Sequence, residues 1–248
     1  MTQDTNPYQV PQADITPEAT PGYHAPRNCP SGRGLAWVLE AWSLYRLSPL
    51  LWIITLMWLV FFTVVSSFVP FSSTLLMPVI SAGIYETVRQ ATLNGQVELA
   101  YLFAGFRQRL GPLVMLGILS TLLTLLCVIP VGVLLALSTN MTHLLANLSI
   151  QSIFVASAII ALVFIPVIMA TWFAPMLVMF ENASPTSALK TSFKACLVNM
   201  GSMTVYGLVM LLVMLAGLLP LGLGLLIAGP LIWLSVYTSY HDIFISRD

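Results

Sequence analysis

The chain has 248 residues, of which 58% are apolar and only 7% charged, against roughly 25% charged residues in an ordinary soluble domain. So few charges could not keep a water-facing surface of this size dispersed, and the composition therefore predicts an integral membrane protein. Nine basic and nine acidic side chains balance, which leaves no basic excess for binding nucleic acid. The three cysteines have no Cys-x-x-Cys spacing, which argues against both a disulfide framework and a zinc site.

Residues 1–32 differ from the rest because they are rich in Pro, Thr, Gln and Asn and contain almost no aliphatic run. Such a segment buries too little apolar surface to offset the entropy lost on ordering, so we predict a disordered cytoplasmic tail. Asn6-Pro7-Tyr8 is a candidate docking motif for a protein partner, although a solvated leader is the simpler interpretation. On this interpretation, deletion of residues 2–30 should leave thermal stability nearly unchanged.

Residues 33–248 form a series of apolar blocks separated by short charged links. A transmembrane helix needs roughly 20 apolar residues, and six blocks are candidates: 49–69, 71–85, 113–137, 153–180, 203–219 and 221–240. Block 71–85 is the weakest, because it is short and contains Pro78, Gly83 and several serines. A re-entrant segment is the alternative there, and we favour a full span that continues as a helix to Arg89. The predicted fold class is all-α: a polytopic bundle of six transmembrane helices in three hairpins.

The distribution of basic residues predicts the orientation. Lys and Arg precede the first span and follow the second, fourth and sixth, whereas the three remaining links contain neither. With six spans, every basic residue falls on one side of the membrane, which the positive-inside rule makes cytoplasmic. We therefore predict a bacterial inner-membrane protein with both termini in the cytoplasm.

The basic links also carry a helical pattern. Apolar and aromatic residues recur at helical spacing within 35–46, 99–110 and 189–200, so we predict a short amphipathic helix lying at the interface before each hairpin. The second helix of each hairpin has a proline followed seven residues later by an aromatic residue. These patterns predict three copies of one internal repeat. The basic residues that could contact anionic lipid are Arg46, Arg107, Arg109, Lys190 and Lys194.

The sequence offers little for catalysis. The middles of all six predicted spans contain no ionisable residue, and Glu86 and Arg89 form a candidate interfacial ion pair one helical turn apart. The three histidines do not converge, and no metal-binding, phosphate-loop or serine-elbow motif occurs. We therefore expect no enzymatic activity, no cofactor and no metal site.

Several short motifs carry a resemblance to a known family. Asn6-Pro7-Tyr8, a Gly32-Arg33-Gly34 entry to a helix, and the closing Tyr-Thr-Ser-Tyr-His-Asp-Ile-Phe at 237–244 resemble a family of uncharacterised proteobacterial six-span inner-membrane proteins. More distantly, the layout is similar to the membrane domain of some glycerophosphodiester phosphodiesterases. The resemblance implies the topology and the location, and it implies no activity.

These observations favour a non-enzymatic envelope scaffold or a lipid-interacting accessory factor, with membrane lipids as partners and no nucleic acid. The motivation is the set of three basic amphipathic helices on the side of anionic lipid. The alternative is a small transporter or export component built on the repeat. A polar, water-accessible cavity near the midplane would favour the alternative, and only Ser, Thr and Gly are available there.

Overall fold

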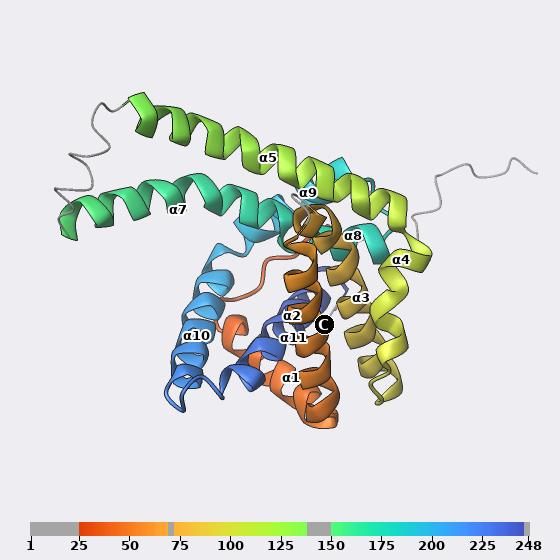
Figure 1. The fold of residues 1–248 in the computed structure, drawn as a ribbon. Helices are drawn as coiled ribbons and strands as arrows, with labels where there is room; N and C mark the ends of the chain where they lie inside the picture. The colour runs from red at the N-terminus through yellow and green to blue at the C-terminus, as the bar shows by residue number, and fades with distance from the viewer. Residues whose placement is uncertain (1–24, 69–71, 138–149, 246–248) are drawn as a thin grey trace, which may run out of the picture.

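The computed structural model describes residues 25–68, 72–137 and 150–245. Every regular element in these ranges is a helix (Figure 1), which confirms the prediction of an all-α fold. Most of the predicted tail, residues 1–24, lies outside the described residues. The links at 69–71 and 138–149 and the final positions 246–248 lie outside them as well.

The helices correspond in order to the predicted blocks. They are α1 (Arg33–Leu47), α2 (Pro49–Ser66), α3 (Ser72–Asn94), the 3₁₀ helix η1 (Leu99–Phe103), α4 (Ala104–Gln108), α5 (Leu110–Leu137), α7 (Ile150–Trp172), α8 (Ala174–Phe180), α9 (Pro185–Val198), α10 (Met200–Leu218) and α11 (Leu225–Phe244).

Local sequence signals explain two of the helix starts. Pro49 opens α2, where its fixed backbone angle suits the first turn and its missing N–H costs no hydrogen bond. Pro185 opens α9, and the Ser184 hydroxyl accepts a hydrogen bond from the backbone nitrogen of Ser187 at 3.4 Å.

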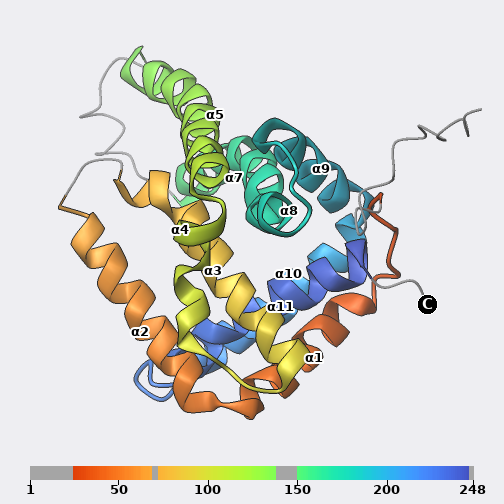
Figure 2. The ribbon, with the colours of Figure 1, turned by 90° about the vertical axis from the view of Figure 1, so that its right-hand side faces the viewer.

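Two helices, α3 and α11, form the centre of the molecule. α1 packs along α11 and α10, while α3 packs against α5, η1, α4 and α8. Figure 2 shows α1 and α11 side by side, with α2 and α3 next to them. The pair α5 and α7 runs across the direction of α2 and α10 (Figure 1). The most apolar helices therefore do not all run parallel to one another.

Two glycines let the segment 99–108 approach α3 so closely that the two backbones are in contact. A Cβ atom at Gly83 would lie 2.0 Å from the carbonyl oxygen of Leu102, and one at Gly105 would lie 2.1 Å from that of Val79. This close fit accompanies a break in the predicted amphipathic helix at 99–110, which is instead the 3₁₀ turn η1 followed by the short α4. By contrast, α1 and α9 are continuous helices of 15 and 14 residues.

Four helical stretches of the described chain are long and apolar enough to cross a membrane: Pro49–Ser66, Leu110–Pro130, Ala161–Phe180 and Met200–Leu218. The predicted spans at 71–85 and 221–240 correspond to α3 and α11, which are not among the four. Both are rich in buried residues that face the protein rather than lipid, including Glu86 and Thr87 on α3 and Ser235 and Ser239 on α11. The six-span, three-hairpin topology stays a prediction.

The outer faces of the apolar helices are suited to lipid. Large apolar side chains are left exposed on α2, α5, α7 and α10, for example Phe61, Leu126, Leu162 and Leu212. A soluble protein rarely exposes so many at once. This surface supports a membrane protein independently of the composition.

Candidate functional site

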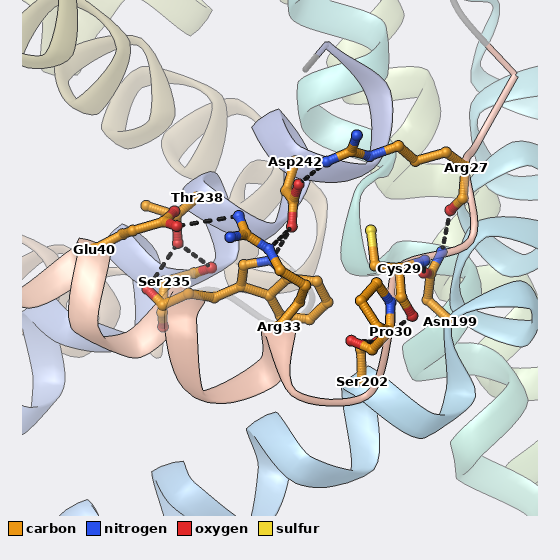
Figure 3. Close-up of polar contacts among 11 residues, drawn as sticks. Arg27, Cys29, Pro30, Arg33, Glu40, Asn199, Ser202, Ser235, Thr238 and Asp242 are labelled. Atoms are coloured by element: carbon orange, nitrogen blue, oxygen red, sulfur yellow. Dashed lines mark hydrogen bonds and ion pairs between the residues drawn. The ribbon is translucent and has the colours of Figure 1, made fainter. Parts of the chain in front are cut away.

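A polar cluster centred on Asp242 ties the beginning of the described chain to its end (Figure 3). Asp242 lies in the last turn of α11 and is only 2% exposed. Its carboxylate accepts hydrogen bonds from Arg27, from Nε of Arg33 at 2.6 Å and from Nε1 of Trp37 at 2.6 Å. Three donors on one carboxylate compensate the cost of burying its charge.

The segment 25–31 lies against the start of α10. The side chain of Asn199 accepts from the backbone nitrogen of Cys29 at 2.8 Å and donates to the carbonyl oxygen of Arg27 at 2.8 Å. The Ser202 hydroxyl donates to the carbonyl oxygen of Cys29 at 2.8 Å, and the Cys29 side chain is buried. We call residues 25–31 the N-terminal strap. Part of the predicted tail is thus in specific contact with the helices.

The ionisable groups of this cluster each keep one protonation state near neutral pH. Burial opposes ionisation of Asp242, but the hydrogen bonds from Arg33, Trp37 and Arg27 outweigh it, so the pKa of the carboxyl lies below its ordinary value. The hydrogen bond to Asp242 raises the pKa of both Arg27 and Arg33. Burial raises the pKa of the Cys29 thiol, which keeps it neutral. None of these four groups changes protonation near neutral pH, so the cluster acts as a fixed clamp.

The candidate ion pair predicted from the sequence is formed. Nη1 of Arg89 lies 3.4 Å from Oε2 of Glu86, and Nε2 of Gln90 donates to Oε1 of Glu86 at 2.7 Å. The Arg89 guanidinium also stacks over the ring of Phe180, 5.0 Å from its centre. These contacts join α3 to α8 at the end where the basic links lie.

The five candidate lipid-contacting residues are not gathered in one place. Arg46 ends α1, Arg107 lies on α4, and Lys190 and Lys194 lie on α9; all four are exposed and make no ion pair with an acidic side chain in the described part of the chain. Arg109 differs, because it donates a hydrogen bond to Asn182 in the link between α8 and α9. The four unpaired cations remain available to a charged partner.

One of these cations borders an apolar groove. The groove has a volume of about 690 Å³ and lies between α5, α7 and α9. Leucine, valine, phenylalanine, alanine and proline side chains line most of it, together with Cys127 and Thr186. Lys190 is the one charged residue among its lining residues. An apolar groove bordered by a single cation suits a lipid, because a lipid has an apolar chain attached to a charged headgroup.

Neither the clamp nor the groove was predicted from the sequence. Asp242, Arg27 and Arg33 all lie on the predicted cytoplasmic side, so their opposite charges were the available signal for the clamp. Lys190 was predicted without its apolar surroundings, because the groove is assembled from the side chains of three helices.

Comparison with known proteins supports the membrane assignment. No family model matches the chain, and no solved structure matches it. A protein of Burkholderia thailandensis named probable inner membrane protein is 28% identical over 196 residues, which covers 71% of this chain and 71% of that relative. The likeness to the membrane domain of glycerophosphodiester phosphodiesterases has no support from these comparisons. Together with the four apolar helices, the similarity identifies the chain as a multi-pass inner-membrane protein.

Proposed function

We propose that this protein is a non-enzymatic accessory factor of the inner membrane that binds anionic phospholipid. The observation that carries the proposal is the groove between α5, α7 and α9 with Lys190 at its border. An acyl chain in the groove covers apolar surface, and each buried methylene is worth about 0.8 kcal/mol. Lys190 supplies the charge that selects an anionic headgroup.

The predicted orientation supports the same assignment. Lys190 belongs to a link that the positive-inside pattern places in the cytoplasm, and anionic lipids are concentrated in the cytoplasmic leaflet. The side chain is exposed and makes no ion pair with an acidic group in the described residues. A phosphate headgroup would therefore meet a cation without displacing a protein partner.

Replacing Lys190 with glutamine should reduce the retention of anionic lipid about five-fold. Each basic side chain near an anionic surface is worth about 1 kcal/mol, and that energy corresponds to this ratio. The measurement is native mass spectrometry of full-length protein taken from membranes that contain both anionic and zwitterionic lipid.

Lys194→Gln is the matched control for this variant. Lys194 lies one helical turn further along α9, is also exposed, and does not line the groove. Both substitutions remove one charge from the same link, so they weaken the orientation signal equally. Equal retention in Lys190→Gln and wild type, or equal losses in both variants, would contradict a site at the groove.

The proposed orientation makes a separate prediction for reporter fusions. Fusions near Asn140 and Pro220 should report a periplasmic position, because the links there contain no Lys or Arg. Fusions near Gln96, Ser187 and Asp248 should report a cytoplasmic position. A cytoplasmic signal at Asn140 would rule out six spans, and a periplasmic signal at Gln96 would show that segment 71–85 is re-entrant.

A further inference from the structure

A second cavity lies between α2, α3, α5, α7 and α8, and it adjoins the lipid groove at Val167, which lines both. Its volume is about 500 Å³, within the range of pockets that hold small organic ligands. Thr63, Thr74 and Met77 at its border are exposed, so the cavity opens to the outside of the protein. Ser120 and Thr124 lie about 10 and 14 residues into α5, which places that wall at mid-membrane depth in the six-span topology.

Hydroxyl groups dominate the polar part of the lining. Nine of the sixteen lining residues carry one: Thr63, Ser66, Ser73, Thr74, Ser81, Tyr85, Ser120, Thr124 and Thr171. The other seven are apolar or aromatic, and none of the sixteen is charged. The lining surface is still mostly apolar, so the cavity combines apolar walls with an unusual number of hydroxyl groups.

Six of the nine hydroxyls donate a hydrogen bond to a carbonyl oxygen of their own helix. Ser120 donates to the Leu116 carbonyl at 2.8 Å, Thr124 to the Ser120 carbonyl at 2.8 Å, and Thr171 to the Val167 carbonyl at 2.9 Å. Each hydroxyl proton is used within its own helix, while the oxygen lone pairs stay available.

Two prolines in the lining remove the helical donor of two carbonyl groups, one on α3 and one on α7. Pro78 and Pro175 line the cavity, and neither has a backbone N–H to donate to the residue four positions earlier. Those residues are Thr74 and Thr171, which line the cavity as well. Their carbonyl oxygens lack the usual helical donor at the point where the pocket lies.

One buried hydrogen-bond donor in the lining has no partner among the described residues. It is Nε1 of Trp172. A buried donor without an acceptor is unfavourable, so a ligand acceptor at this position would gain the missing bond. Trp172 is the last residue of α7, where the chain bends at Phe173 before α8 begins.

We propose that this cavity binds an uncharged amphiphile that carries hydroxyl and ester groups, of the monoacylglycerol class. Its hydroxyls donate to the serine, threonine and proline-exposed carbonyl acceptors, and its ester carbonyl accepts from Trp172. Its chain covers the apolar residues, among them Phe62, Leu116 and Val167. An anionic lipid is excluded because no cation lines the cavity to balance its charge. Lys190 does not line this cavity, so the proposed ligand does not depend on that charge.

The test uses radiolabelled monolauroylglycerol and full-length protein in nanodiscs of zwitterionic lipid. Combined Thr124→Val and Thr171→Val substitutions should weaken binding about 10-fold, because each lost hydrogen bond is worth roughly a three- to ten-fold change. Trp172→Phe keeps an aromatic ring but removes the N–H, and it should weaken binding several-fold. Dodecyl phosphate is charged, and methyl laurate has no hydroxyl group. Neither should compete with the labelled monolauroylglycerol.

The matched control is the double variant Thr92→Val and Thr204→Val. Thr92 donates to the Val88 carbonyl at 2.9 Å and Thr204 to the Met200 carbonyl at 2.8 Å, and neither lines this cavity. The control and Lys190→Gln should both bind monolauroylglycerol as wild type does. Absence of binding to wild type, equal binding by the cavity and control variants, or competition by dodecyl phosphate would overturn the proposal. A normal melting temperature of each variant in detergent shows that folding is intact.

Discussion

Replacing Asp242 with asparagine is expected to lower the free energy of unfolding by about 2–3 kcal/mol. The carboxylate is buried and accepts from Arg27, Arg33 and Trp37, so its loss leaves Arg27 without an anion and Arg33 with only the exposed Glu40. Breaking a buried pair costs about 3–5 kcal/mol, and we reduce that value because both arginines are about one-third exposed. The measurement is thermal unfolding of purified protein in detergent.

Glu40→Gln is the matched control for this substitution. Glu40 pairs with the same Arg33 at 3.1 Å, but both side chains are substantially exposed. An exposed pair contributes at most about 1 kcal/mol, so the control should shift the melting temperature little. Equal shifts for the two variants would show that the clamp is no stronger than a surface ion pair.

The Asp242 carboxylate also makes the free energy of unfolding depend on pH. Its pKa is lower in the folded protein than in the unfolded chain, so its contribution is complete above the ordinary Asp pKa of about 3.9. The contribution is lost as the pH falls through the lower, folded value. Wild type should therefore lose more stability than Asp242→Asn when the pH is lowered below about 4.

Deletion of residues 2–31 is expected to lower the free energy of unfolding by about 3–4 kcal/mol, whereas deletion of residues 2–24 leaves the contacts of the strap in place. The longer deletion removes Arg27 from Asp242 and takes away the backbone partners of Asn199 and Ser202. Each lost hydrogen bond to a buried group is worth about 1 kcal/mol. Because of the strap contacts, we expect loss of residues 2–30 to lower stability, whereas the sequence alone predicts almost no change.

Melting temperatures of the two deletions, compared in the same detergent, separate the contributions. A melting temperature equal to wild type for both would mean that the strap contributes nothing to stability. Asn199→Ala in the full-length chain is a further check, because it should lower stability in the same direction while leaving residues 2–31 present.

Features set by neighbouring residues could be predicted from the sequence. The starts of α2 and α9 follow from Pro49 and from Ser184 with Pro185, since caps act within one helical turn. Glu86 and Arg89 are three positions apart on one helix, so their pairing is also local.

Features that depend on packing could not be predicted. Residues 99–110 have helical periodicity, yet they form η1 and α4, where Gly83 and Gly105 bring two backbones into contact. The hydroxyl-lined cavity needs side chains from five helices, and its serines and threonines are individually unremarkable in sequence. Periodicity reports which face of a helix is apolar, but not which helices meet there.

The clamp also has a consequence for biosynthesis. Arg27 and Asp242 are separated by 215 positions, so the ribosome must complete α11 before the two can meet. Until then the strap has neither its carboxylate partner nor the carbonyl of Ile243 to which the Arg27 nitrogen donates. The clamp therefore cannot close before α11 has been synthesised, and a chain truncated before Asp242 lacks the carboxylate that binds Arg27, Arg33 and Trp37.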